Sequence, residues 1–383
     1  MSEFLLNEVC ELIVDCPHTT ANDEGKGFPL VRTPNIGKGR LVYDGMHRVC
    51  EDVYNKRNAR AIPQENDLIF AREATAGNVA LIQKGEKVCL GQRTVLIRPN
   101  QEKVNPAFLT YFLLAPKQQY KLLSTANGAT VAHVNLPTIR NLKIDLPELP
   151  AQHRIASILS RYDSLIENYQ KQIKLLEEAA QRLYKEWFVD LHFPGHENTK
   201  IVDGVPEGWE KMKVDSIYSI KYGKILSTKL ITETGLFPVY GANGVIGYYD
   251  KANCNEQVVL ITSRGNGSGD VLVTYHKDSF ITNNSFVVTP LEGYEYCKLP
   301  FTFQFLKMAN FRAVRTGAAQ PQLTNQSIHT VDVVLPNRCL IEKYCAATVR
   351  MNDAIIKYRE QLRLLTEARD RLLPKLMSGE ITV

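Results

Sequence analysis

Few short segments of this 383-residue chain carry residue types that could do chemistry, and each of them is incomplete. The segment Gly265-Asn266-Gly267-Ser268-Gly269 follows an apolar run and is rich enough in glycine to surround a phosphate. It lacks the Lys-Ser/Thr pair of a nucleotide-binding P-loop, and it lacks the full spacing of a dinucleotide fingerprint. We therefore predict that this segment is a turn.

A second segment, Asn105-Pro106-Ala107-Phe108, is faintly similar to the Asn-Pro-Pro-Tyr/Phe motif of adenine methyltransferases. That motif acts at a strand end beside a methyl-donor fold, and the chain has no glycine fingerprint for such a fold. Asparagine followed by proline is also a common way to begin a helix. We predict that Asn105 caps a helix that continues through Phe108 to Leu114.

Metal and nucleophile patterns are equally weak. The spacings Cys10-x5-Cys16-x-His18 and His192-x3-His196 do not match a zinc framework, and we predict no metal site. The eight cysteines form no Cys-x-x-Cys pair, which favours a reduced cytoplasmic protein over a disulfide scaffold. No Ser/His/Asp set and no nuclease-type carboxylate–lysine cluster stands out, so we expect a recognition protein rather than an enzyme.

The strongest feature is an internal repeat. Tyr169 and the residues after it recur from Tyr358 onward, 189 positions later, and Leu146-Pro147 recurs with the same offset as Leu335-Pro336. The period is too long for a solenoid, so it indicates that one module was duplicated. Short apolar segments upstream are also similar to each other at offsets of 191 and 192 positions, for example Leu68-Ile69-Phe70 and Leu260-Ile261-Thr262. We predict two related globular modules, built from short strands and turns, whose loops have diverged.

Each copy also contains a heptad stripe, which predicts a long helix with one apolar seam. The seam residues predicted for the first helix are Ile155, Leu159, Tyr162, Ile166, Tyr169, Ile173, Leu176 and Leu183. Those predicted for the second are Tyr344, Met351, Ile355, Tyr358, Leu362, Leu365 and Leu372. At ~1.5 Å per residue, the first helix should be about 55 Å long.

Two helices with the same heptad phase in one chain are expected to pack against each other, although each stripe could instead pack only on its own module. The pattern does not distinguish parallel from antiparallel pairing. Arg369 is the one poor seam residue, at the position where the other copy has Ala180. We expect its side chain to reach water near a helix end.

Composition narrows the functional classes further. The chain has 46 Lys and Arg against 41 Asp and Glu, a net charge of +5, so any nucleic-acid contact must come from local clusters rather than from overall charge. The acidic residues of the first 16 positions do not fit a signal peptide. No apolar run is long enough to span a membrane. Three functions remain open: a DNA-reading subunit, a coiled-coil adaptor that holds proteins, and a stand-alone adenine methyltransferase.

Several segments together resemble the specificity (S) subunits of type I restriction–modification enzymes. The segments are Pro150-Ala151-Gln152-His153-Arg154-Ile155, Leu175-Leu176-Glu177-Glu178-Ala179, Pro206-Glu207-Gly208-Trp209, Gly241-Ala242-Asn243-Gly244, Arg264-Gly265-Asn266-Gly267 and the tail from Arg371 to Ile381. The resemblance covers essentially the whole chain and favours the DNA-reading function.

The resemblance implies an α+β fold, with two similar mixed α/β target recognition domains separated by two long helices that form an antiparallel coiled coil. The domains would span residues 1–150 and 209–336, the helices 151–187 and 337–383, and a linker 188–208. It also implies that each domain reads one half of a bipartite site on double-stranded DNA. The partners would be two methyltransferase (M) subunits, which hold S-adenosylmethionine, and restriction (R) subunits, which use ATP and magnesium. No cofactor is expected in this chain.

Phosphate contacts position a protein on DNA, whereas base contacts specify sequence, with arginine suited to guanine and asparagine or glutamine to adenine. Candidate DNA-binding residues in the first domain are Arg32, Asn35, Lys38, Arg40, Arg72 and Arg93. Those in the second domain are Lys221, Lys224, Asn243, Arg264, Asn266, Arg312, Arg315 and Gln320. Arg72 and Arg264 occupy the same place in the repeat, which a common backbone contact and a shared structural ion pair explain equally well.

Overall fold

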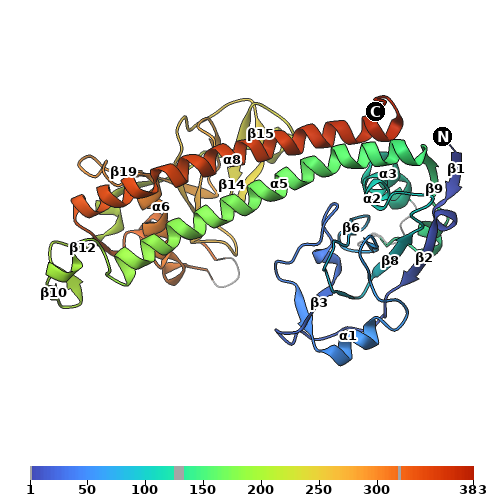
Figure 1. The fold of residues 1–383 in the computed structure, drawn as a ribbon. Helices are drawn as coiled ribbons and strands as arrows, with labels where there is room; N and C mark the ends of the chain where they lie inside the picture. Colours follow the sequence, from blue (N-terminus) through green and yellow to red (C-terminus); the bar gives the residue numbers. More distant parts are fainter. Residues whose placement is uncertain (1, 125–132, 318–320) are drawn as a thin grey trace. The chain divides into compact units, whose positions relative to one another are not determined.

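The computed structural model describes residues 2–124, 133–317 and 321–383 of the protein. The chain forms two compact units (Figure 1). The first contains residues 1–167 and 363–383, and the second contains residues 168–362. Each unit therefore holds one β-rich domain together with one part of each long helix.

Across the part of the first unit that the structure describes, the strands form three small sheets. Strand β1 (Ser2–Leu5) pairs with β9 (Lys143–Leu146). A four-stranded antiparallel sheet has the order β2 (Cys10–Asp15), β8 (Thr94–Pro99), β5 (Leu68–Ala71), β6 (Val79–Leu81). A three-stranded sheet has the order β4 (His47–Val49), β3 (Phe28–Val31), β7 (Cys89–Leu90), and β3 runs parallel to β7.

The described residues of this domain also form four short α-helices: α1 (Glu51–Arg57), α2 (Pro106–Leu114), α3 (Pro116–Ser124) and α4 (Leu136–Arg140). The predicted start of α2 is confirmed, because the Asn105 side chain accepts a hydrogen bond from the Phe108 amide at 2.9 Å. Both faces of β5 are buried, which explains why its sequence is a continuous apolar run. One face packs with Phe108 and Phe112 of α2, and the other packs with residues of the three-stranded sheet.

The second unit repeats this topology strand for strand. Strand β12 (Glu210–Lys213) pairs with β20 (Asp332–Leu335). The four-stranded order is β13 (Tyr218–Tyr222), β19 (Ser285–Pro290), β16 (Val259–Thr262), β17 (Val271–Val273). The three-stranded order is β15 (Gly244–Tyr249), β14 (Phe237–Gly241), β18 (Phe280–Ile281), again with one parallel pair. Helices α6 (Leu299–Met308) and α7 (Asn325–Ile328) correspond to α2 and α4, and the hairpin of β10 (Ile201–Val202) and β11 (Val205–Pro206) precedes the domain.

The two long helices are α5 (Leu149–Tyr184) and α8 (Arg338–Ser378), and they pack together as an antiparallel pair (Figure 1). In the first unit, Asp163 of α5 bonds Arg369 of α8. In the second unit, the Tyr169 and Tyr358 rings lie 5.1 Å apart, and the Tyr344 hydroxyl donates to the Ala180 carbonyl oxygen at 3.0 Å. Positions rise along α5 as they fall along α8, so the predicted α+β fold with an antiparallel coiled coil is confirmed.

Every residue of the predicted seam is buried or half-buried. The helices also pack on the domains near their ends: Ile155 and Leu159 lie in the same core as Phe108 and Leu376. Packing on the partner helix and packing on the domain therefore occur together. The expectation that Arg369 would reach water is wrong, because its guanidinium donates to the buried carboxylate of Asp163 at 2.8 Å.

Candidate nucleic-acid interface

In the second unit, four loops from separate parts of the sequence lie together beyond the ends of the strands. The Ser263 amide donates to the Asn284 carbonyl oxygen at 2.8 Å, and the Asn283 amide donates to that of Lys224 at 3.0 Å. The Gly265 amide donates to the Pro321 carbonyl oxygen at 3.0 Å. The predicted turn at residues 265–269 is confirmed as part of this group, within the connection between β16 and β17.

The segment that carries Arg312 is held against the same turn. The Arg312 guanidinium forms an ion pair with Asp270 at 2.5 Å. Gly269 has a positive φ of 89°, and a Cβ placed on it would lie 3.1 Å from the Arg312 amide nitrogen. Only glycine allows this close approach without strain, so the glycine-rich sequence serves the packing of two loops.

Most of the candidates predicted in this domain lie on these loops or on the adjoining strand β13. Among the described residues, the exposed candidates whose side chains form no hydrogen bond or ion pair are Lys221, Lys224, Asn243, Arg264 and Asn266. Arg312 is exposed but paired with Asp270, and Arg315 is half-buried and donates to the Arg312 carbonyl oxygen at 3.1 Å. Gln320 lies outside the described residues. We call the first five residues and Arg312 the second-domain loop cluster.

The corresponding loops of the first unit also lie together. The Thr75 hydroxyl donates to the Thr33 carbonyl oxygen at 2.8 Å, and the Asn78 amide group donates to that of Ile36 at 2.9 Å. The Arg72 amide donates to the Arg93 carbonyl oxygen at 2.9 Å. Residues 32–40, 72–78 and 91–93 therefore form one surface, but their side chains are used differently from those of the second unit.

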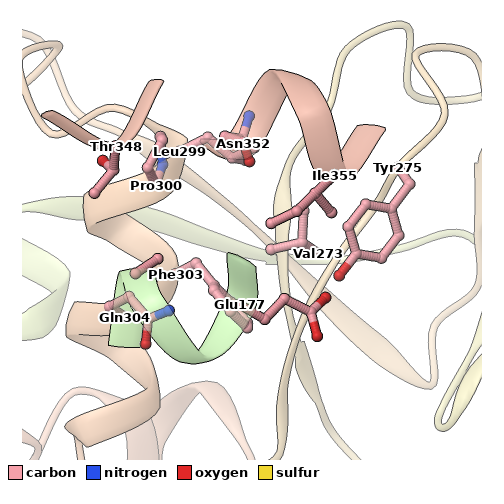
Figure 2. Close-up of a pocket in the computed structure, with 11 residues that line it drawn as sticks. Glu177, Val273, Tyr275, Leu299, Pro300, Phe303, Gln304, Thr348, Asn352 and Ile355 are labelled. Atoms are coloured by element: carbon pink, nitrogen blue, oxygen red, sulfur yellow. The ribbon is translucent and has the colours of Figure 1, made fainter. Parts of the chain in front are cut away.

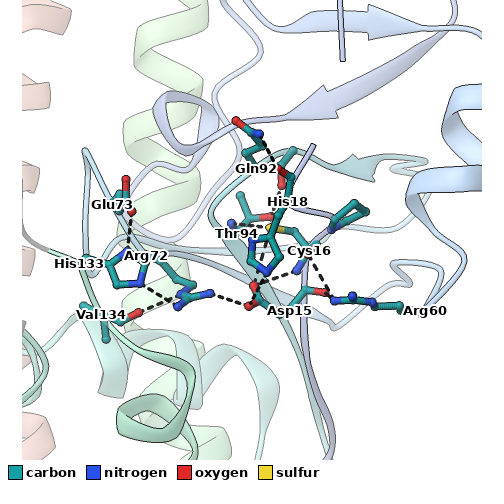
Figure 3. Close-up of polar contacts among 12 residues, drawn as sticks. Asp15, Cys16, His18, Arg60, Arg72, Glu73, Gln92, Thr94, His133 and Val134 are labelled. Carbon is teal, nitrogen blue, oxygen red and sulfur yellow. Dashed lines mark hydrogen bonds and ion pairs between the residues drawn. The ribbon is translucent and has the colours of Figure 1, made fainter. Parts of the chain in front are cut away.

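Arg72 is fully engaged inside the protein (Figure 3). Its guanidinium donates to the Asp15 carboxylate at 2.6 Å, to the Val134 carbonyl oxygen at 2.9 Å and to a ring nitrogen of His133 at 2.8 Å. Arg72 is only 7% exposed. Burial and the nearby Arg72 and Arg93 lower the pKa of His133, which keeps that ring neutral and able to accept this bond. Arg72 therefore ties β5 to β2 and to the segment at 133–134.

The other first-domain candidates differ in how far they are available. The Arg32 guanidinium donates to the Gly45 carbonyl oxygen at 3.0 Å, and Arg40 pairs with Glu167 at 2.8 Å. The Asn35 side chain is 2% exposed and donates to the Val42 carbonyl oxygen at 3.1 Å, so it fixes the loop. Arg93 is exposed and paired with Glu73, and Lys38 is exposed. We call Lys38, Arg40 and Arg93 the first-domain loop cluster.

Sequence reasoning missed the residues that hold these arginines. Glu73 accepts from both Arg93 and His133, and Asp15 accepts from Arg72. Asp15 and His133 lie about 60 positions from Arg72 in the chain, so no local pattern links them to it. The one available signal was the repeat, which marked Arg72 without revealing its partners.

Asp15, Cys16 and His18 bring three possible metal-binding atoms within 4.8 Å of one another, the one such group within the described ranges. Asp15 already accepts from the Arg72 guanidinium, and burial raises the pKa of the Cys16 thiol, which disfavours the thiolate that a metal would need. The donor set therefore fits a structural hydrogen-bonded cluster better than a metal centre. None of the helices in the described ranges has both the length and the apolar character to cross a membrane.

Comparison with known proteins indicates which kind of protein carries these two clusters. The family model of the type I restriction modification DNA specificity domain matches residues 1–178 and 206–339. The chain belongs to this family. It is a DNA specificity subunit of a type I restriction–modification system, the non-catalytic component that the family comprises.

Individual relatives agree with this assignment. The chain is 23% identical over 388 aligned positions to the type I restriction enzyme MjaIX specificity subunit of Methanocaldococcus jannaschii, covering 94% of this chain and 88% of the relative. It is 30% identical to the putative type I restriction enzyme MjaX specificity subunit of the same organism, over 58% of this chain and 52% of that one. The crystal structure of the type I restriction–modification S subunit from M. genitalium shares the fold, with a TM-score of 0.61, 19% identity, and coverage of 98% and 95%.

Proposed function

We propose that each β-rich domain reads one half of a bipartite site on double-stranded DNA, through the first-domain and second-domain loop clusters. The main support for this proposal is that the two domains share one topology but differ in the residues on their loops. The two domains have the same strand order in all three sheets, yet their exposed polar residues differ in type and in pairing. One scaffold that presents two different surfaces suits a protein that must recognise two different half-sites.

The chemistry of the second-domain loop cluster supports direct base reading. Arg264 offers a planar guanidinium that can bond guanine, while Asn243 and Asn266 offer amide groups that can bond adenine. Lys221 and Lys224 provide positive charge for phosphates, which fixes the position of a domain on the duplex. Because the whole chain carries a net charge of only +5, its affinity for DNA must come from such clusters.

In the first-domain loop cluster the positive charges are partly compensated. Arg93 and Arg40 pair with Glu73 and Glu167, respectively. In each pair one side chain is exposed and the other is half-buried or mostly buried. Ion pairs at a protein surface stabilise it little, by about 0–1 kcal/mol, so each arginine can exchange its carboxylate partner for a phosphate at small cost. We propose that Arg40 and Arg93 change partner when DNA binds, whereas Arg72 stays bonded to Asp15.

We further propose that the helix pair sets the distance between the two half-sites and docks methyltransferase subunits, to which restriction subunits are added for cleavage. In such a complex S-adenosylmethionine would be held by the methyltransferase partner, and ATP with magnesium by the restriction partner. This chain would supply sequence recognition alone. The support is family membership together with the apolar seam that joins α5 to α8.

The test is selection from a randomised duplex library by this chain in complex with its methyltransferase partner. We expect enrichment of two short sequence blocks separated by an unspecified gap of constant length. Arg264→Ala should relax the preference within one block, and Arg93→Ala should weaken contacts at the other block only. If both substitutions affect the same block, or if one continuous motif is enriched, the assignment of one domain to each half-site is wrong.

A further inference from the structure

A buried charged pair lies in the helix seam of the first unit. The Asp163 carboxylate, 5% exposed, accepts hydrogen bonds from the Tyr111 hydroxyl at 2.5 Å and from the Arg369 guanidinium at 2.8 Å. Asp163 belongs to α5, Arg369 to α8 and Tyr111 to α2, so three elements meet at this carboxylate. The Asp163 carboxylate is thus satisfied by a cation and a hydroxyl, and the Arg369 guanidinium also bonds Asp370, its exposed neighbour on α8, at 2.8 Å.

The equivalent place in the second unit holds no charged pair. The repeat places Asn352 at the position of Asp163 and Ala180 at the position of Arg369. The aligned residues Phe108 and Phe301 place Gln304 at the position of Tyr111. Ala180, Asn352 and Gln304 all line a cavity of about 40 Å³, and Figure 2 shows Asn352 and Gln304 at its wall. At the repeat position where the first unit has an arginine, the second unit thus has a small side chain beside a cavity.

This difference distinguishes α5 from α8, whose seams are otherwise alike. Because α5 and α8 carry matching seams, two copies of the chain could pair α5 with α5, or α8 with α8, through the same apolar residues. In an antiparallel α5–α5 pair, Asp163 would face Ala180 instead of Arg369. In an α8–α8 pair, Arg369 would face Asn352. An α5–α5 pair would therefore bury the Asp163 carboxylate without a cation, which is strongly destabilising. An α8–α8 pair would leave Arg369 with only the exposed Asp370 of its own helix, without the buried carboxylate.

We propose that the Asp163–Arg369 pair selects which helices associate: it favours α5 on α8 and disfavours pairing of α5 or α8 with the same helix of a second copy. A single charged pair is sufficient because the second unit is neutral at the equivalent place. Glu177 and Arg359 form a second ion pair between α5 and α8, but this pair is more exposed and is expected to contribute less to the selection. The inference does not depend on how the domains read DNA.

The test uses full-length chains carrying charge reversals, with two different affinity tags, expressed together. Asp163→Arg and Arg369→Asp are each combined with themselves and with each other, and native mass spectrometry measures the complexes that carry both tags. When the two variants are mixed, α5 of each chain can meet α8 of the other with one arginine and one aspartate in each pair. We expect at least about tenfold more two-tag complex from the mixture than from either variant alone.

Two controls make the result specific. Asp163→Arg and Arg369→Asp in one chain should restore the oligomeric state of the wild type. Glu177→Arg and Arg359→Glu reverse a more exposed pair between the same helices, in which Arg359 also stacks on Tyr275, and mixing them should give no such enrichment. The complete set is also built with lysine and glutamate in place of arginine and aspartate, so that a poorly packing reversed pair does not decide the outcome.

The proposal is overturned if the mixed variants give no more two-tag complex than the unmixed ones while the double reversal in one chain folds. It is also overturned if each single reversal keeps the oligomeric state and thermal stability of the wild type. The proposal stands if the mixture alone is enriched and the double reversal matches the wild type.

Discussion

The repeat-equivalent arginines Arg72 and Arg264 give the sharpest prediction, because the same residue type has opposite surroundings in the two units. Arg72 is buried and bonds Asp15, Val134 and His133. Arg264 is exposed and bonds none of the described residues through its side chain. We therefore expect Arg72→Ala to reduce stability and Arg264→Ala to reduce DNA binding.

The magnitudes follow from these contacts. Removing one partner of a buried ion pair costs about 3–5 kcal/mol, and we expect the lower end for Arg72→Ala because the Asp15 side chain keeps 15% of its surface exposed. In a unit of this size, about 3 kcal/mol corresponds to a decrease in Tm of roughly 6–12 °C. Arg264→Ala should change stability by less than about 0.5 kcal/mol. Its loss of binding, about 1–3 kcal/mol if it reads a base, raises Kd roughly 5- to 150-fold.

The assay is differential scanning calorimetry of each variant beside DNA binding by its methyltransferase complex at fixed salt. Arg72→Lys and Arg264→Lys serve as matched controls, because lysine keeps the charge but loses the planar fork of donors. Arg72→Lys should remain destabilised, and Arg264→Lys should retain phosphate attraction while its base preference weakens. These roles of Arg72 and Arg264 are refuted if Arg72→Ala keeps the Tm of the wild type and abolishes binding, or if Arg264→Ala unfolds the second domain.

Three further predictions concern the helices and the cysteines. Insertion of one heptad into each long helix lengthens the pair by about 10 Å, so methylation footprinting should show a gap roughly 3 base pairs longer; an unchanged gap would contradict the spacing role. Arg369→Ala should lower the free energy of unfolding by about 3–5 kcal/mol in urea titration, and Asp163→Asn with Arg369→Ala should lower it less, because that double variant buries no unpaired charge; equal losses would contradict this. At pH 8, thiol labelling followed by peptide mass spectrometry should modify the exposed residues Cys50 and Cys339 quickly. Cys297 should react only after unfolding, because it is buried and burial raises the pKa of its thiol to about 12. Equal labelling rates would contradict this difference in burial.

Sequence patterns were sufficient for the architecture because its signals are local or periodic. The heptad stripes predicted α5 and α8, and the repeat predicted two related domains, since a duplicated module keeps its core positions. The predicted cap at Asn105 is confirmed because a helix start depends on a few neighbouring residues. Antiparallel pairing entered only with the family resemblance, because the heptad pattern is the same for either direction.

The candidate interface was less accessible to sequence reasoning. Whether an arginine is free depends on residues far along the chain, as the bonds from Arg72 to Asp15 and His133 show. Arg369 illustrates the same limit: it looked like a defect in the seam because its partner, Asp163, lies 206 positions away. The heptad period predicts which side of the helix a side chain faces, but it does not show which charged residue lies opposite it.

Two unlike surfaces on one scaffold are proposed to read the two halves of one DNA site. Sequencing the methylated bases in cells that express this chain with its methyltransferase partner tests this proposal most directly. We expect methylation to fall within a single two-part motif, with a constant gap between the parts, and we expect Arg264→Ala to relax one part while the other is unchanged. Methylation at one continuous motif, or a gap that varies from site to site, would contradict it.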